Sequence, residues 1–342
     1  MTVSLQDIAD RAGVSVKTAS GALHGGSARL SEDTRRRVRG LATELGYVPN
    51  LAARGMRQGF LPIVGVVADG LITSPFAAEL MRSLDNALRR ADGTAAVVTT
   101  VGTRGRDGRG VEAGVLELAR LRPRAMAFAA LYHKVVSLPP GAAEHLRVLV
   151  NCREEGAAAG RVPSLVPAEA AAAADLARHL FARGRRRLAF LTLPGLAAGL
   201  LREAGLRSAC DEAGLGLPAD RVRPATRGAI YAEGPRRSLV GDHVRAWMAE
   251  RDPPDAIVCG NDRIAMEAYG ALARIGARVP DDVAVAGFDN QAEIATRLDP
   301  PLTTMALPYK AMGRRAAAIL VGGEAGRGVE EIPFRLVRRS ST

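Results

Sequence analysis

The chain has 342 residues, of which 47% are hydrophobic and 24% charged, the balance of a globular protein with a sizeable core and not of a disordered chain. At ~150 residues per domain this length predicts about two domains, and the formal charge of +11 is compatible with a nucleic-acid partner. The chain has no run of about 18 uncharged apolar residues and opens without the apolar segment of a signal peptide, so we expect a cytoplasmic protein with no membrane partner.

The first sixty residues predict three short helices. Ser4 and Asp7 form a capping-box-like start to an amphipathic helix over 5–12, and Gly13 ends it. Ser15 is placed to cap a second helix that runs to about residue 24, and Ser31 caps a third. Two short helices joined by a glycine turn and braced by a third are typical of a helix-turn-helix, although any small three-helix bundle would also fit. Residues 1–59 carry nine basic and five acidic residues, a net charge of +4.

From residue 61 onward, apolar strand-like runs alternate with helical ones. Continuous apolar strands separated by helices predict parallel sheets covered on both faces, and therefore an α/β fold. The expected strands lie at 63–68, 95–100, 125–131, 146–151, 188–193 and 256–260, and the expected helices near 76–91, near 109–121 and from Pro167 to Phe181.

Two N-terminal segments of the chain are VSLQDIADRAGVSVKTASGALHG and LSEDTRRRVRGLATELGYVPNLAARGMRQG, and later segments, in order, are IVGVV, SPF, GRRRLAF, IVCGND, VPDDV, GFDN and PLTT. This ordered series resembles the lactose repressor (LacI/GalR) family of bacterial transcription regulators, and the two N-terminal segments resemble the family's DNA-binding headpiece.

This resemblance implies a small all-α helix-turn-helix headpiece at 1–49, a hinge helix and linker at 50–59, and an effector-binding and dimerisation domain at 60–342. The large domain would have the two-lobed fold of type I periplasmic binding proteins, in which the chain crosses between the lobes three times. The expected first lobe is about 61–162 and 294–322, and the second about 163–293 and 323–342.

The resemblance also assigns DNA contacts. Val16 and Lys17, in the first turn of the second helix, are expected to read base edges in the major groove, since lysine can donate to guanine and valine can contact a thymine methyl. An alternative for Lys17 is a solvated helix charge. Gly21 stands where many relatives carry a base-contacting arginine, so the operator is not transferable from a relative. Hydroxyls suited to phosphate contacts are those of Ser15, Thr18, Ser20 and Thr34.

Residues 50–57 match the family's hinge helix, which is too short to be stable alone and is expected to fold when two copies meet on DNA. Met56 takes the position of the apolar side chain that enters the minor groove, with simple linker packing as the alternative. Further expected DNA contacts here are Asn50, Ala53 and Arg57.

Effector-binding residues are expected in the cleft between the lobes, where the carboxyl ends of parallel strands collect. Arg202 could instead be a surface charge, Phe76 a core aromatic and Asp289 a helix cap. The segment Val166-Pro167-Ala168 lacks the aspartate that many relatives carry. The expected residues are Ser74, Phe76, Asn151, Arg202, Tyr231, Asn261 and Asp289.

The sequence therefore predicts a ligand-responsive repressor that binds a near-palindromic double-stranded operator as a homodimer and responds to a small effector, a sugar by family analogy. A corepressor-dependent or nucleoside-responsive regulator of the same fold is the alternative, and a solute-binding protein or a nucleoid protein is a remote one. We expect no enzyme activity: the G-x-G-x-x-A pattern at 214–219 follows a helix and contains a proline. We expect no cofactor or metal, because neither the five histidines nor Cys152, Cys210 and Cys259 show metal spacing.

Overall fold

The computed structural model describes residues 3–24, 30–48, 55, 59–70, 77–92, 94–101, 109–156, 160–228 and 237–342. The chain divides into two compact units, Met1–Pro62 and Ile63–Thr342, and each is considered by itself.

The N-terminal unit contains the three predicted helices, α1 (Leu5–Ala12), α2 (Val16–His24) and α3 (Glu32–Glu44). The Ser4–Asp7 capping box is confirmed, and Gly13 ends α1 in the left-handed conformation at φ 62°, which a glycine adopts without steric penalty. The helices enclose one small core made by Ile8, Ala9, Ala12, Ala19, Ala22, Val38 and Ala42.

The first lobe of the larger unit is built on a six-stranded sheet with the order β13-β5-β4-β3-β1-β2. Parallel pairing joins β1 to β2, β3 to β4, β4 to β5 and β5 to β13. The strands are β1 (Leu61–Asp69), β2 (Ala95–Val101), β3 (Pro123–Val136), β4 (Val148–Glu154), β5 (Ser164–Pro167) and β13 (Val329–Ile332).

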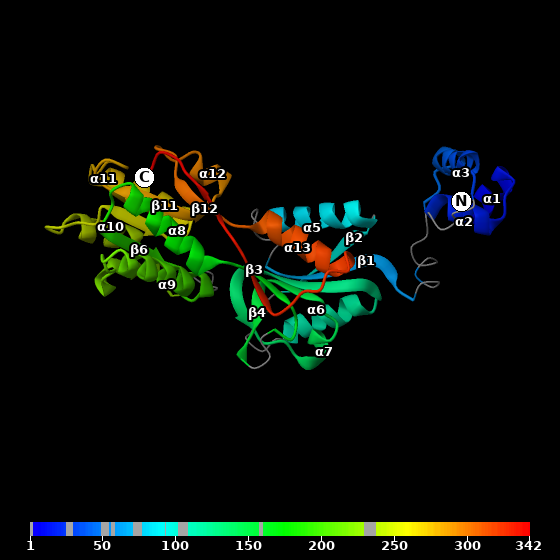
Figure 1. Cartoon of the computed structure of the whole chain (residues 1–342), viewed down its shortest axis with the longest axis horizontal. Coiled ribbons are helices and arrows are strands. Elements are labelled where there is room, and N and C mark those ends of the chain that lie inside the picture. Colours follow the sequence, from blue (N-terminus) through cyan, green and yellow to red (C-terminus); the bar gives the residue numbers. More distant parts are fainter. Residues whose placement is uncertain are drawn as a thin grey trace. The chain divides into compact units, whose positions relative to one another are not determined.

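Helices cover both faces of this sheet (Figure 1). On one face lie α5 (Ala77–Asp92) and α13 (Tyr309–Val321), which share a core with the inward side chains of the strands. On the other face lie α6 (Arg109–Ala119) and α7 (Pro140–Ala143), with a second core beneath them.

The second lobe has a six-stranded sheet with the order β14-β12-β11-β10-β6-β7. Pairing is parallel except between β12 and β14. The strands are β6 (Leu188–Thr192), β7 (Val222–Pro224), β10 (Ala256–Cys259), β11 (Ala284–Asp289), β12 (Thr303–Ala306) and β14 (Arg335–Val337).

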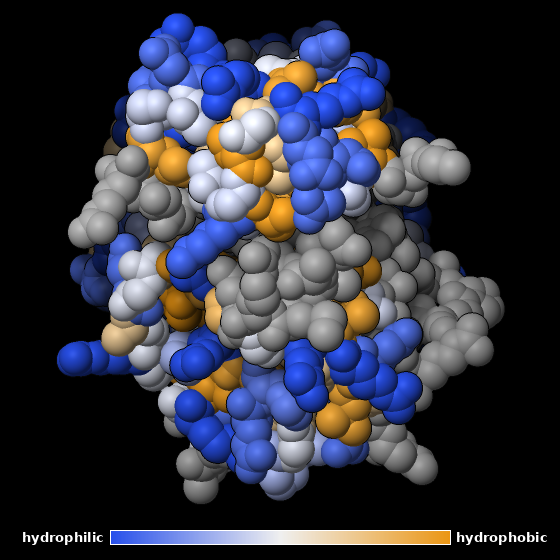
Figure 2. Space-filling view, turned by 90° about the vertical axis from the view of Figure 1, so that its right-hand side faces the viewer, coloured by the Kyte–Doolittle hydropathy of each residue, from blue (hydrophilic) through white to orange (hydrophobic). Residues whose placement is uncertain are grey.

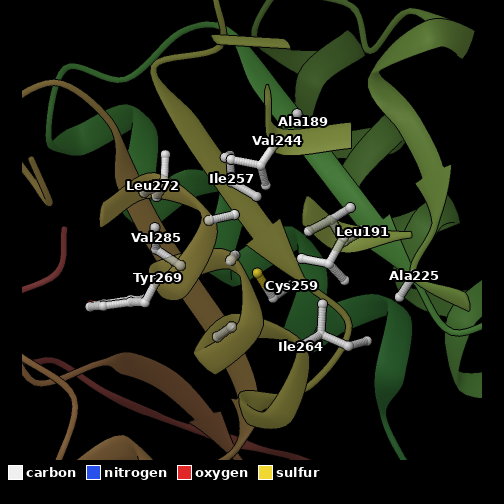
Figure 3. Packing of buried hydrophobic residues seen from close by; sticks show 14 of the residues in the cluster. Ala189, Leu191, Ala225, Val244, Ile257, Cys259, Ile264, Tyr269, Leu272 and Val285 are labelled. Atoms are coloured by element: carbon white, nitrogen blue, oxygen red, sulfur yellow. The ribbon is translucent and has the colours of Figure 1, made fainter. Parts of the chain in front are cut away.

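Two helical layers cover this second sheet, α8 (Glu169–Ala182) with α9 (Ala197–Glu212) on one face and α10 (Val240–Met248) with α11 (Asp262–Arg274) on the other. Figure 3 shows the core under α10 and α11, where Ile257 and Val285 of the strands meet Ile264 and Leu272. Shorter elements are α12 (Ala292–Ala295), the 3-10 turn Ala219–Arg221, and a hairpin of β8 (Thr226–Arg227) and β9 (Arg237–Ser238).

The predicted α/β class, with parallel sheets and an all-α headpiece, is confirmed, but three strands lie in the other lobe from the one expected. The segment 294–322, expected in the first lobe, is divided, because β12 within it pairs with β11 in the second sheet. Pro167, expected to start a helix in the second lobe, ends β5 in the first sheet instead, and α8 begins at Glu169.

The third strand in the other lobe is β13, which lies within the expected second-lobe segment 323–342 but pairs with β5 of the first sheet, Val329 opposite Ser164. These partners are 165 residues apart (329 − 164), so no local pattern in the sequence could reveal the pairing. The chain passes between the lobes three times: after β5, after β12, and between β13 and β14.

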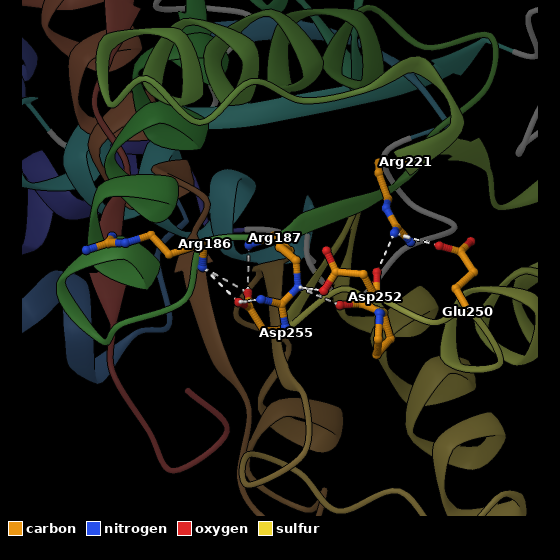
Figure 4. Close-up of polar contacts among 7 residues, drawn as sticks. Arg186, Arg187, Arg221, Glu250, Asp252 and Asp255 are labelled. Atoms are coloured by element: carbon orange, nitrogen blue, oxygen red, sulfur yellow. Dashed lines mark hydrogen bonds and ion pairs between the residues drawn. The ribbon is translucent and has the colours of Figure 1, made fainter.

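The three arginines at 185–187 have structural roles at the start of β6. The Asp255 carboxylate accepts hydrogen bonds from the main-chain N–H groups of Arg186 and Arg187, at 2.9–3.0 Å (Figure 4). Arg185 donates to the carbonyl of Pro280. Asp255 thereby fixes the entry into β6 beside β10.

The surface in Figure 2 carries hydrophilic residues over much of the visible face, with hydrophobic ones in small scattered groups between them. Apolar atoms spread in this way are ordinary for a protein surface.

We expect Asp255→Ala to lower the free energy of unfolding by about 1–3 kcal/mol, because two main-chain donors lose their acceptor. Asp252→Ala is the matched control: its carboxylate also meets Arg187, at 3.0 Å, but is 78% exposed, so its loss should change the free energy by less than about 1 kcal/mol. Urea denaturation measures both, and equal losses would contradict the role given to Asp255.

Candidate DNA-binding face and ligand site

Helix α2 presents the residues expected to read DNA on its outer side. Ala19 and Ala22 are fully buried against α1 and α3, whereas Val16 and Lys17 are exposed. Because the buried alanines lie on one side of α2, the first turn of the helix is free to enter a groove of DNA. The expected base-reading pair is therefore on the surface of the unit.

The hydroxyls expected to contact phosphates already take part in helix capping. Ser15 Oγ accepts a hydrogen bond from the Thr18 N–H at 3.1 Å and lies 2.9 Å from Thr18 Oγ1. Thr34 Oγ1 lies 2.9 Å from Ser31 Oγ, the cap of α3. Both pairs are at helix N-termini, where the free N–H groups and the helix dipole favour an anion. Ser20 is half-buried.

Several predicted residues lie outside the described part of the chain. They are Asn50, Ala53, Met56 and Arg57 of the hinge segment, and Ser74, Phe76 and Tyr231 of the effector site.

Of the remaining effector candidates, Arg202 and Asp289 lie close to the place where the two lobes meet, and Asn151 lies in the first lobe beside Leu131 of β3. Asn151, expected just after the fourth strand, lies within β4 and has a positive φ of 61°. Its Nδ2 donates to the carbonyls of Ala130 and Leu131, each at 3.0 Å, and its buried Oδ1 has no hydrogen-bond partner. This atom is a free acceptor at the boundary.

Arg202 on α9 is held in a buried ion pair with Glu169 at the start of α8. Nε of Arg202 donates to Glu169 Oε2 at 2.6 Å, and NH1 donates to the carbonyl of Gly260. The guanidinium carbon lies 4.1 Å from the ring centroid of Phe288. Because Arg202 is 2% exposed, the alternative of a surface charge is wrong.

The electrostatics of the pair are mutually reinforcing. Burial favours the neutral acid, but the guanidinium of Arg202 and the ring of His133 together outweigh it and lower the pKa of Glu169. Burial likewise opposes the charge on Arg202, and the carboxylate of Glu169 raises the pKa of that guanidinium above its usual value. Both groups are therefore charged at neutral pH.

A glycine permits the helix approach behind this pair. A Cβ at Gly205 would lie 2.0 Å from the carbonyl oxygen of Ala170, an impossible contact. Gly205 is one turn after Arg202, and Ala170 is next to Glu169, so the close crossing of α8 and α9 brings the two charges together.

Residues of the first lobe reach the same pair. His133 on β3 has its Nδ1 3.6 Å from Glu169 Oε1, longer than a hydrogen bond. Tyr309, at the start of α13, contributes to the electrostatic environment of Arg202 and hydrogen-bonds to the carbonyl of Leu131 at 3.4 Å. Side chains from both lobes thus converge on Arg202.

Two further carboxylates belong to this region. Asp262 accepts hydrogen bonds from Thr304 Oγ1 and from the Gln291 N–H, each at 2.7 Å. Asp289, at the end of β11 with a φ of 102°, accepts from Gln291 Nε2 at 2.9 Å. The N-cap of α12 is Gln291, so Asp289 does not cap that helix.

Burial and the neighbouring Asp289 carboxylate raise the pKa of Asp262 to about 8. Burial raises the pKa of Asp289 to about 6, with Arg202 opposing the rise and Glu169 adding to it. We call His133, Asn151, Glu169, Arg202, Asp262, Asp289 and Gln291 the lobe-boundary cluster.

Asn261, the last effector candidate, caps α11: its Oδ1 accepts from the Ile264 N–H at 2.9 Å. Sequence reasoning missed His133, Glu169, Asp262 and Gln291. Glu169 offered a weak signal, because it is the one charged residue at the start of an alanine-rich helix. Asp262 directly follows Asn261, which the sequence did single out.

In the residues that the structure describes, no helix has the length and apolar character to cross a membrane. Within the same ranges, no three histidine, cysteine or acidic side chains gather as a metal site.

Comparison with known proteins finds a family match in each of the two units. Residues 4–50 match the model of "Bacterial regulatory proteins, lacI family", and residues 177–342 match that of the "Periplasmic binding protein-like domain". The sucrose operon repressor of Escherichia coli is 32% identical over 344 residues, with 99% of each chain covered.

Two solved structures show the same fold. A putative LacI-family transcriptional regulator from Rhizobium etli superposes with a TM-score of 0.71 at 28% identity, over 82% of this chain and 98% of that one. The lac repressor dimer bound to operator and the anti-inducer ONPF superposes with a TM-score of 0.75 at 22% identity, over 100% of this chain and 99% of that one.

The raised pKa of Asp262 predicts a pH-dependent stability. An acid whose folded pKa is about 8 and whose unfolded pKa is ~4 stabilises the fold fully below pH ~4 and loses that contribution as the pH rises through the folded value. Urea midpoints of wild type and Asp262→Asn, measured from about pH 5 to about pH 8, should show wild type losing stability relative to the variant. A constant difference between the two proteins across this range would contradict the assignment.

Proposed function

This chain belongs to the LacI family of bacterial regulatory proteins and is a DNA-binding transcription regulator, and we propose that it acts as a homodimeric repressor whose operator affinity is set by a small effector bound at the lobe boundary. Two observations in one chain carry this proposal. The N-terminal unit has a helix, α2, whose first turn is exposed, and the larger unit has two lobes with buried polar groups close to the place where they meet.

The DNA contacts follow from the exposed first turn of α2. In a homodimer, two such helices would enter successive major grooves, so the operator would be a near-palindrome. Lys17 would donate to a guanine edge and Val16 would contact a thymine methyl, which supplies the sequence discrimination. The hydroxyl of Ser15, and that of Thr34 beside the cap residue Ser31, lie at helix N-termini suited to phosphates. We also keep the predicted hinge segment 50–59, with Met56 as its minor-groove residue.

The effector would bind where the strands of both sheets end. Asn151 on one lobe and Asp289 with Gln291 on the other offer acceptors that a ligand rich in hydroxyl groups could satisfy. A sugar is supported by the sucrose operon repressor, whose name gives the operon that it controls. The regulator would thus act by binding, in the cytoplasm, with no catalytic step.

Coupling between the two sites would run through the lobes. An effector that touches both lobes favours one relative setting of them, and the hinge segments would fold on DNA in only one setting. The coupling is reciprocal: if the effector changes operator affinity by some factor, operator DNA changes effector affinity by the same factor.

The DNA-reading assignment is tested by selecting binding sites from random duplexes with the full chain, which should enrich a near-palindrome. Lys17→Ala should then weaken binding to that site about 5- to 150-fold, the loss of one base contact of ~1–3 kcal/mol, and leave binding to random DNA nearly unchanged. Arg36→Ala is the charge-matched control, because Arg36 is an exposed arginine of α3. An equal loss on both kinds of DNA in Lys17→Ala would remove its base-reading role.

The effector site is tested with Asp289→Ala. The variant should lose the response of operator binding to the effector, because a boundary carboxylate is gone, while operator affinity without effector stays close to wild type. Asp281→Ala, whose carboxylate is 65% exposed on the same lobe, should keep the response. Gel-shift titrations with a panel of neutral saccharides measure both, and a surviving response in Asp289→Ala would show that the site is misplaced.

A further inference from the structure

Glu169 already forms an ion pair with the guanidinium of Arg202, the group that an anionic ligand would need. Arg202 uses Nε on Glu169, NH1 on the carbonyl of Gly260, and one face on the ring of Phe288. Its Nε contact with the carboxylate is 2.6 Å, and the two side chains are 3% and 1% exposed. The charge of this cation is therefore already offset by a carboxylate of the chain itself.

A second cation near the ends of the first-lobe strands is also paired. Lys134, next to His133 on β3, forms an ion pair with Asp69, the last residue of β1. Burial lowers the pKa of Lys134, which weakens it further as an anchor for an anion. Both cations are therefore matched by carboxylates of the chain itself.

Two hydrogen-bond acceptors of the lobe-boundary cluster are left over, and His133 Nδ1 is likewise buried with no hydrogen-bond partner. Asn151 uses its Nδ2 on two main-chain carbonyls, and Gln291 uses its Nε2 on Asp289. The opposite atoms, Asn151 Oδ1 and Gln291 Oε1, are buried with no hydrogen-bond partner. Asp289 and Asp262 contribute further carboxylate oxygens, held by hydrogen bonds from Gln291 and Thr304.

We propose that Glu169 is a built-in counter-ion that neutralises Arg202 and thereby makes the lobe boundary select uncharged, hydroxyl-rich effectors over ligands that carry a carboxylate or phosphate. This inference rests on the proposed effector function of the same site. A hydroxyl group donates to a buried acceptor, whereas an anion brought beside Asp289 and Glu169 is repelled, and the guanidinium of Arg202 is already paired with Glu169. Glu169 does not act on the ligand by contact; it sets the charge that the ligand meets.

The first experiment removes the counter-ion and offers a small replacement. Glu169→Ala leaves the guanidinium of Arg202 buried beside a space of carboxylate size, so the variant should be less stable than wild type. Formate should then raise its melting temperature by about 1–4 °C, or restore its folded fraction by circular dichroism, in a concentration-dependent way. Chloride at equal ionic strength is the reference.

Two proteins control this rescue. Wild type and the double variant Glu169→Ala/Arg202→Met, which has no guanidinium, should show no formate effect beyond that of chloride. If formate does nothing for Glu169→Ala, or stabilises the double variant equally, the counter-ion role is overturned.

The second experiment measures selectivity with matched ligands. Wild type should bind a neutral sugar at least about tenfold more tightly than its acid, with cellobiose against cellobionate and glucose against gluconate as the probes. Glu169→Gln keeps the side-chain shape and an acceptor for Arg202 but removes the charge, so it should narrow that ratio about tenfold or more. Calorimetry gives the ratio, and an acid that binds wild type as tightly as its neutral partner would overturn the proposal.

The two experiments separate this inference from the proposed function. If no saccharide binds any of the proteins, the sugar effector is wrong, and the formate rescue still decides whether Glu169 neutralises Arg202. Saccharides could also bind and shift operator affinity while the ratio of affinities for the acid and the neutral sugar is the same in wild type and Glu169→Gln. That result would support the proposed regulator and contradict the role given to Glu169.

Discussion

The buried ion pair between Glu169 and Arg202 is the constraint on which the lobe boundary depends. Glu169 is the first residue of α8, directly after the chain first leaves the first sheet, and Arg202 fixes it to α9 and to the end of β10. Removing one partner of such a pair leaves an uncompensated buried charge, which typically costs about 3–5 kcal/mol. The pair therefore holds α8 and α9 of the second lobe together. Two residues of the first lobe, His133 and Tyr309, approach the pair at this place.

The structure of the N-terminal unit is set by local interactions and not by a buried ion pair. Its core is small and its helices are set by local signals, the serine caps and the glycine turn. Among the described residues of this unit, no polar or charged side chain is buried. The proposal therefore assigns the response to a ligand to the larger unit, in which Glu169, Arg202 and Asp262 are buried. The proposed mechanism therefore requires one unit to bind DNA and the other to bind the effector.

Local features of the sequence predicted much of this structure, and long-range pairing accounts for the rest. Helix starts at Ser4, Ser15 and Ser31 follow from side-chain capping, and apolar runs locate most strands. The lobe in which β5, β12 and β13 lie depends on partners far along the chain. The same holds for the site: Arg202 was expected as an effector ligand, but its partner Glu169 is 33 residues away, and no spacing rule links the two. The hinge residues and Ser74, Phe76 and Tyr231 stay predictions.

The most direct test of the regulator itself is a footprint of the purified full chain on DNA flanking its own gene, repeated over a series of salt concentrations. Sequence reading by α2 predicts a protected near-palindrome that persists at moderate salt, because base contacts remain when phosphate contacts are screened. Diffuse protection that disappears as salt rises would mean that only the phosphates are bound, and would contradict a sequence-specific regulator.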